Sequence, residues 1–156
     1  MLNMWWTVAA AALVAGVISV CLLTRLRQSW RQSRLAQARR DFRLQRERLE
    51  ANFIQLAART GKPRGLAWAD CEFDDDVAMA RDRHTGELRA LVGVTVRFEA
   101  IEGGDMEDVE AVGRLRAATA VFRAERNRWV TDGRAIFNLN PSEAIRHFQS
   151  ELEMVD

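Results

Sequence analysis

The feature that most constrains this chain is an uncharged run of nineteen residues close to its N-terminus, from Trp5 to Leu23. The run is dominated by Ala, Val and Leu. A helix of this length reaches roughly 28 Å, close to the ~30 Å hydrocarbon core of a bilayer. We therefore predict a transmembrane anchor over residues 1–23. Its anchoring side chains are expected to be Trp5, Trp6, Leu13, Val17 and Leu22, with the two tryptophans at the interface.

A cleaved signal peptide is the alternative explanation of this apolar run. The usual positive segment before the run is missing, the run is long for a signal peptide, and no small-x-small cleavage pattern follows it. A lipoprotein site at Cys21 is disfavoured because Val20 stands where such a site needs a small residue. These features favour a retained signal-anchor helix that crosses the membrane once.

Flanking charge predicts the orientation of the anchor. No Lys or Arg precedes the apolar run, whereas six arginines follow it before the first acid. Lys and Arg within ~15–20 residues of a membrane helix collect on the cytoplasmic side. We expect the N-terminus outside and the C-terminal domain in the cytoplasm, at a bacterial inner membrane. The four arginines nearest the bilayer are expected to contact anionic lipid, with a topology signal alone as the alternative: Arg25, Arg27, Arg31 and Arg34.

The net charge of +1 conceals a strong asymmetry along the chain. Residues 24–64 hold twelve Lys or Arg against three acids, and residues 65–156 hold eleven Arg against nineteen acids. The chain is therefore a basic segment followed by an acidic domain. An acidic domain without a basic face and interleaved aromatic residues disfavours nucleic acid as a partner.

The basic segment, residues 24–61, is predicted to be a helical stalk. No Pro or Gly interrupts the chain from Leu22 to Thr60, and Gly61 and Pro63 then favour a helix end. Apolar residues recur in it every seven positions: Leu35, Phe42, Leu49 and Leu56. This spacing is compatible with a coiled coil and hence with a homo-oligomer, although Gln45 and Asn52 weaken a strict zipper. We favour the alternative that Leu49 to Ala57 packs on the protein's own sheet.

Residues 62–156 are predicted to form one small α+β domain. In the long strand, Leu88 to Phe98, apolar side chains alternate with Arg89, Thr95 and Arg97, as in a half-buried antiparallel strand. Gly86 predicts a hairpin turn before it. Asn140, Pro141 and Glu143 predict the start of a final helix that runs to about Leu152. The expected strands are Leu66–Phe73, Val77–Arg83, Leu88–Ile101, Ala117–Ala124 and Trp129–Leu139.

The expected fold is thus a transmembrane helix continuing into a stalk, then a curved antiparallel sheet of four to five strands with a C-terminal helix. The stretch from Ala117 to Arg123, followed by Asn127-Arg128-Trp129, resembles the terminal hairpin of the cystatin/NTF2-like group. The resemblance covers about 25 residues. It implies a helix packed on a curved sheet but no single activity, because the group includes enzymes, ligand binders and membrane-tethered assembly subunits. A helix after the final strand departs from the group's common pattern.

Two acidic clusters are the strongest candidates for metal binding. Hard cations such as Ca²⁺ and Mg²⁺ need several carboxylate oxygens. Neither cluster has the spacing of a calcium loop, so we favour solvated loops and expect neither a metal nor a cofactor. The clusters are Asp70, Glu72 and Asp74–Asp76 in the first, and Asp105, Glu107, Asp108 and Glu110 in the second.

Catalytic residues are not indicated by any recognisable pattern. His84 and His147 are isolated in the sequence. Cys21 lies inside the apolar run and Cys71 in the domain that follows, so a disulfide between them is not expected. His147 and Asp132 could act as an acid–base pair only if the fold brought them together. Two hypotheses remain: a membrane-anchored, non-catalytic interaction or assembly domain, such as an accessory subunit of a larger complex, or a small-molecule binder or enzyme with a pocket between sheet and helix.

Overall fold

The computed structural model describes residues 2–60, 65–107, 109, 113–126 and 128–155. The chain divides into two compact units, Met1–Arg40 and Asp41–Asp156, which we describe separately. The elements follow one another as α1 (Leu2–Thr60), β1 (Leu66–Asp82), β2 (Leu88–Ala100), β3 (Arg116–Glu125), β4 (Arg128–Val130), β5 (Ala135–Phe137), α2 (Pro141–His147) and β6 (Leu152–Met154).

Helix α1 is continuous over 59 residues. The predicted passage from the apolar run into the basic segment without a break is confirmed, as the absence of Pro and Gly between Leu22 and Thr60 indicated. Gly61 and Pro63, the predicted helix stop, lie outside the described residues. The division between the two units falls inside α1, after Arg40, so the last third of α1 belongs to the same compact unit as the sheet.

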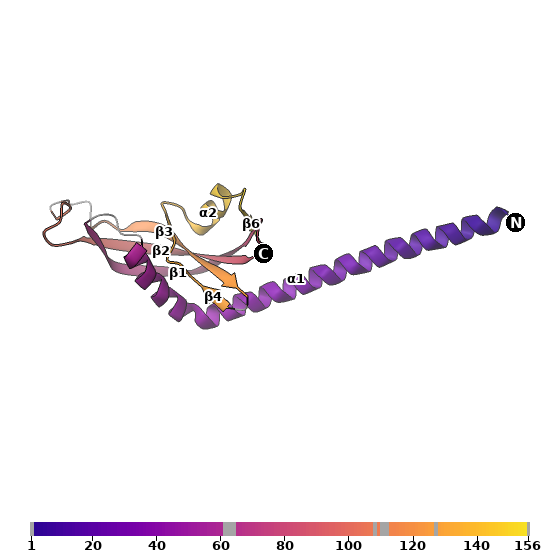
Figure 1. The fold of residues 1–156 in the computed structure, drawn as a ribbon, viewed down its shortest axis with the longest axis horizontal. Coiled ribbons are helices and arrows are strands. Elements are labelled where there is room, and N and C mark those ends of the chain that lie inside the picture. Colours follow the sequence, from indigo (N-terminus) through magenta and orange to yellow (C-terminus); the bar gives the residue numbers. More distant parts are fainter. Residues whose placement is uncertain (1, 61–64, 108, 110–112, 127, 156) are drawn as a thin grey trace. The chain divides into compact units, whose positions relative to one another are not determined.

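The sheet is antiparallel, with strand order β4-β3-β2-β1-β6 and with β5 pairing to β3 (Figure 1). The predicted α+β class is confirmed, with six strands where four or five were expected. Figure 1 shows the long strands side by side, with α2 on the face opposite to the end of α1. The hairpin turn at Gly86 is also confirmed, because this glycine has a φ of 74°.

Two predicted strand boundaries differ from the structure. Leu66–Phe73 and Val77–Arg83 form the single strand β1, whose pairing to β2 shifts register between Phe73 and Val77. This shift is a bulge, in which extra residues stay in the strand without facing a partner. The predicted strand Trp129–Leu139 is instead the two short strands β4 and β5, separated by a segment in which Gly133 has a φ of 76°.

The end of α1 packs on one face of the sheet through a stripe at helical spacing. Phe42, Leu49, Phe53 and Ala57 are each at most 1% exposed. The Phe42 ring lies 5.3 Å from that of Phe122 in β3, in an edge-to-face arrangement. The alternating side chains of β2, from Ala90 to Phe98, line the same face and are buried. The prediction that Leu49 to Ala57 packs on the protein's own sheet is therefore confirmed.

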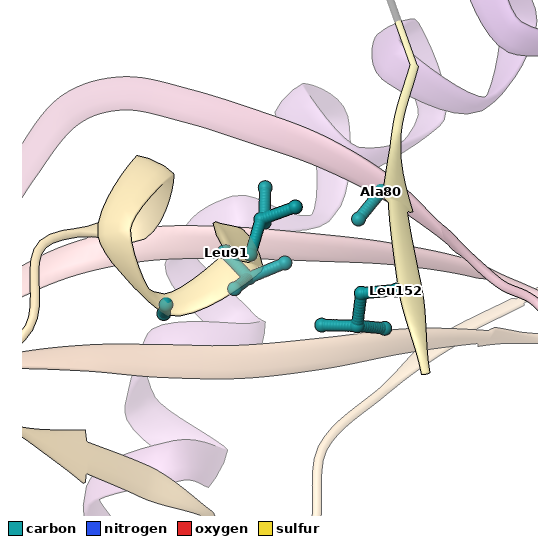
Figure 2. Close-up of a cluster of buried hydrophobic side chains, with 5 residues drawn as sticks. Ala80, Leu91 and Leu152 are labelled. Atoms are coloured by element: carbon teal, nitrogen blue, oxygen red, sulfur yellow. The ribbon is translucent and has the colours of Figure 1, made fainter. Parts of the chain in front are cut away.

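A second, smaller cluster covers part of the opposite face (Figure 2). It joins Ala80 of β1 and Leu91 of β2 to Ala144, Ile145 and Leu152. Helix α2 starts as predicted, with a capping box between Asn140 and Glu143. Its predicted extension to Leu152 was wrong: the helix ends at His147, and the chain turns at Phe148 so that Leu152 enters this cluster and starts β6, which pairs with β1.

Candidate functional site

The first candidate site is the apolar N-terminal part of α1. By length and composition this helix is long and apolar enough to cross a membrane. Leu13, Val17 and Leu22 are 71%, 60% and 57% exposed, so Met1–Arg40 does not bury these predicted anchor residues within itself. Large exposed apolar side chains along one helix need another apolar medium or a partner to cover them. The side chains of Trp5 and Trp6 lie outside the described residues.

The basic part of the same unit is equally open. The side chains of Arg25, Arg27, Arg31 and Arg34 are all exposed on α1. In the part of the chain that the structure describes, none of these four guanidinium groups forms an ion pair with a carboxylate. Their predicted roles, contact with anionic lipid and determination of topology, therefore stay predictions.

The acidic residues Asp74–Asp76 lie in the bulge of β1. Arg46 of α1 donates from Nη1 to the main-chain oxygen of Asp75 at 2.9 Å, and from Nη2 to that of Asp74. Its Nε donates to Glu50 at 2.6 Å. The guanidinium thus satisfies carbonyl groups that the bulge removes from the β1–β2 ladder. The Asp74–Asp76 side chains stay exposed, so this cluster is organised through its main chain.

The other predicted polar sites do not converge. Among the described residues, no group of three or more His, Cys, Asp or Glu side chains is placed to hold a metal ion. Asp108 and Glu110 lie outside the described residues. His147 packs its ring edge-to-face on Phe148 at 4.9 Å, whereas Asp132 accepts a hydrogen bond from the main chain of Arg134. Burial, and secondarily the charge of Asp70, raises the pKa of the Cys71 thiol to about 11, which makes it a poor nucleophile at neutral pH.

Asp82 organises the turn between β1 and β2, a role that sequence analysis missed. Its Oδ1 accepts from the main-chain N–H groups of His84 and Thr85 at 2.9 and 3.0 Å, and its Oδ2 accepts from Arg89 at 2.5 Å. The Thr85 N–H, then the His84 N–H and the Arg89 guanidinium, lower the pKa of this carboxyl to about 2, against the opposing effect of burial. Asp at the end of a strand, two and three residues before its donors, is an available local signal for such a turn.

The second candidate site is a groove between α1 and β4, of about 360 Å³. We call it the α1–β4 groove, and it is lined by Arg48, Leu49, Asn52, Gln55 and Leu56 of the helix and by Arg128, Trp129, Val130 and Thr131 of the strand and the residue after it. Leu49 and Trp129 are buried and form its floor, whereas both arginines are exposed.

The polar side chains of the α1–β4 groove come from both walls. Arg48, Asn52 and Gln55 follow one another at spacings of four and three, which places them on one side of the helix. Arg128 stands on the strand wall. Within the described residues, neither arginine forms an ion pair with a carboxylate; Arg48 donates only to Gln45, at 3.1 Å. The site was not predicted from the sequence, because Asn52 and Gln55 form it only together with strand residues far along the chain.

Comparisons of the chain with protein-family models, with curated protein sequences and with solved structures found no significant match. The fold and the two candidate sites therefore rest on the residues themselves. They define an α+β unit that continues from a helix long and apolar enough to span a bilayer.

Proposed function

We propose that this protein is a membrane-anchored, non-catalytic interaction or assembly domain, such as an accessory subunit of a larger membrane complex. The apolar N-terminal part of α1 is its anchor, and Asp41–Asp156 is its working domain. In this proposal the N-terminus lies outside and the domain lies in the cytoplasm, held at a bacterial inner membrane. The arginines after the apolar run support that orientation through the positive-inside rule.

The observation that carries the proposal is the filled core where α1 covers the face of the sheet; the α1–β4 groove lies at the last strand of the order, outside this core. A binder or enzyme with a pocket between sheet and helix needs open space there. Aromatic rings occupy this space instead: Phe53 lies 5.8 Å from Phe73 and 5.9 Å from Phe122, and Phe42 lies 5.1 Å from Trp129. Phe42, Leu49, Phe53 and Ala57 of α1 are each at most 1% exposed. Surface contact is therefore the mode of action that this domain supports best.

Two further expectations belong to the same proposal. The resemblance of the β3–β4 region to the terminal hairpin of cystatin/NTF2-like proteins stays a hypothesis. Within that group, the membrane-tethered assembly subunits are the members whose role matches this proposal. Contact of Arg25, Arg27, Arg31 and Arg34 with anionic lipid would add roughly 1 kcal/mol of membrane attraction for each cation near the surface.

Photo-crosslinking in native membranes tests the proposal. A photoreactive amino acid replaces Leu44, which is 85% exposed, in the full chain. We expect a discrete adduct of defined mass that mass spectrometry resolves into this chain and a second polypeptide. The same amino acid at Phe53, which is fully buried, is the matched control and should give no adduct. If Leu44 and the exposed Leu115 both yielded only uncrosslinked chain, the interaction function would be wrong.

A further inference from the structure

We propose that the α1–β4 groove binds an extended acidic peptide segment of a partner protein, which adds to the sheet as a strand beside β4. The inference rests on the proposed interaction function and names the surface and the class of partner. Three independent features of the groove carry it: a sheet edge, two uncompensated cations and a pair of amide side chains.

The sheet edge comes first. β4 stands at the end of the strand order and pairs on its inner side with β3, from Arg123↔Val130 to Glu125↔Arg128. The other side of β4 has no neighbouring strand in this order. A strand edge of this kind is a template for an added strand. Three residues of β4 extend about 10 Å, enough to pair with three residues of a peptide.

Charge specifies the side chains of that peptide. Arg48 and Arg128 approach the groove from opposite walls and have no carboxylate partner within the described structure. Guanidinium groups bind carboxylates through paired, charge-assisted hydrogen bonds. A peptide with Asp or Glu toward both walls would neutralise them. The floor formed by Leu49 and Trp129 favours an apolar side chain between the acids, since alternate residues of a strand point to opposite faces.

The amide side chains favour a peptide over a small anion. Asn52 and Gln55 are exposed, and each can donate and accept hydrogen bonds at once. A peptide main chain presents the complementary donors and acceptors, whereas phosphate or acetate offers oxygen acceptors. The groove therefore suits an extended segment in which acidic and apolar residues alternate.

Selection from a library of random octapeptides tests the inference. The full chain, held in lipid nanodiscs, is the bait. We expect enrichment of octapeptides that alternate Asp or Glu with apolar residues. Arg48→Glu and Arg128→Glu should each weaken binding of a selected peptide by about tenfold or more, because each removes a charge-assisted contact and adds repulsion. The double variant should reverse the preference and enrich Lys and Arg instead.

Matched controls separate a built site from general charge. Arg114→Glu changes the same charge at an exposed position outside the groove and should leave binding unchanged. Methylation of the selected peptide's main-chain nitrogens should abolish binding, because it blocks strand pairing. Three outcomes would overturn the proposal: equal loss in the Arg114 variant, full competition by acetate or phosphate, or no enrichment that depends on Arg48 and Arg128. Such a failure would leave the crosslinks at Leu44 intact, so it is distinguishable from a failure of the proposed function.

Discussion

Gly133, in the segment between β4 and β5, lies close against the main chain of α1. A Cβ atom built on it would lie 2.5 Å from the main-chain nitrogen of Ala57 and 2.7 Å from the carbonyl carbon of Leu56, and its φ is 76°. We predict that Gly133→Ala destabilises Asp41–Asp156 by about 2–5 kcal/mol, because left-handed strain adds to overpacking. Urea denaturation of this fragment measures the change in the free energy of unfolding.

The control for that experiment is Gly86→Ala. Gly86 has a nearly identical φ of 74°, but a Cβ there meets nothing within 4 Å. Only the backbone strain remains, so a loss of about 1–2 kcal/mol is expected. Equal losses in the two variants would mean that the helix next to Gly133 adds no steric cost, which would contradict the prediction.

Asp82 predicts a specific response to acid. Its pKa is lowered from 3.8 to about 2 by the Thr85 and His84 N–H groups and by Arg89. The stability it contributes is therefore complete above the unfolded value near 3.8 and is lost as pH falls through the folded value near 2. Asp82→Asn should be less stable than the wild type at pH 7, and the difference should narrow between pH 4 and pH 2. Urea midpoints measured across this range provide the test; a constant difference would contradict it.

A contact between residues could be predicted when its partners are close in the sequence, and could not when they are far apart. The capping box of Asn140 and Glu143 and the positive φ of Gly86 were predictable, because each depends on neighbours within a few positions. The contacts of Arg46 with the main chain of Asp74 and Asp75 were not, since they join residues 28 and 29 positions apart. The strand partner of a helix side chain can be identified only once the packing of the helix on the strand is known.

At the scale of elements, the sequence predicted the buried faces of helices and strands better than it predicted where the elements begin and end. The alternation in β2 and the spacing of Phe42, Leu49 and Phe53 in α1 correctly indicated which faces are buried, because burial sets both periods. The bulge in β1 was invisible, since three consecutive acids read as a loop. The end of α2 was predicted too late because only tertiary packing explains why Leu152 leaves the helix to enter the second cluster.

The packing of α1 on the sheet leads to a prediction about fragments. A fragment of residues 62–156 should be less stable than residues 41–156, because it lacks Leu49 and Phe53 and exposes the face on which they pack. Each fully buried side chain of this size contributes roughly 1.5–3 kcal/mol. The thermal midpoints of the two fragments are compared. Phe53→Ala in residues 41–156 should lower the free energy of unfolding by about 3–5 kcal/mol and give an intermediate midpoint. Equal midpoints would show that α1 does not stabilise the sheet.

At the scale of the whole molecule, the chain combines a unit with exposed apolar side chains and a unit that buries its own core. In Met1–Arg40, large apolar side chains from Leu13 to Leu26 and a row of arginines are exposed, and α1 is the one element among the described residues of this unit. Asp41–Asp156 has its own core on both faces of a sheet. A unit of the first kind depends on its surroundings, and a bilayer with anionic headgroups supplies both an apolar medium and a negative surface.

The orientation of the anchor in the membrane can be tested directly. Reporters fused after Asp156 of the full chain should show activity of a cytoplasmic fluorescent protein and none of periplasmic alkaline phosphatase, because Lys and Arg next to a membrane helix resist translocation. A second variant moves the charge: glutamine replaces four arginines, and three lysines are added after Met1. Its phosphatase activity should rise, since the charge bias is then inverted. Phosphatase activity from the unaltered chain would contradict the cytoplasmic placement, and unchanged reporters in the second variant would show that other features set the orientation. The four replaced residues are Arg25, Arg27, Arg31 and Arg34.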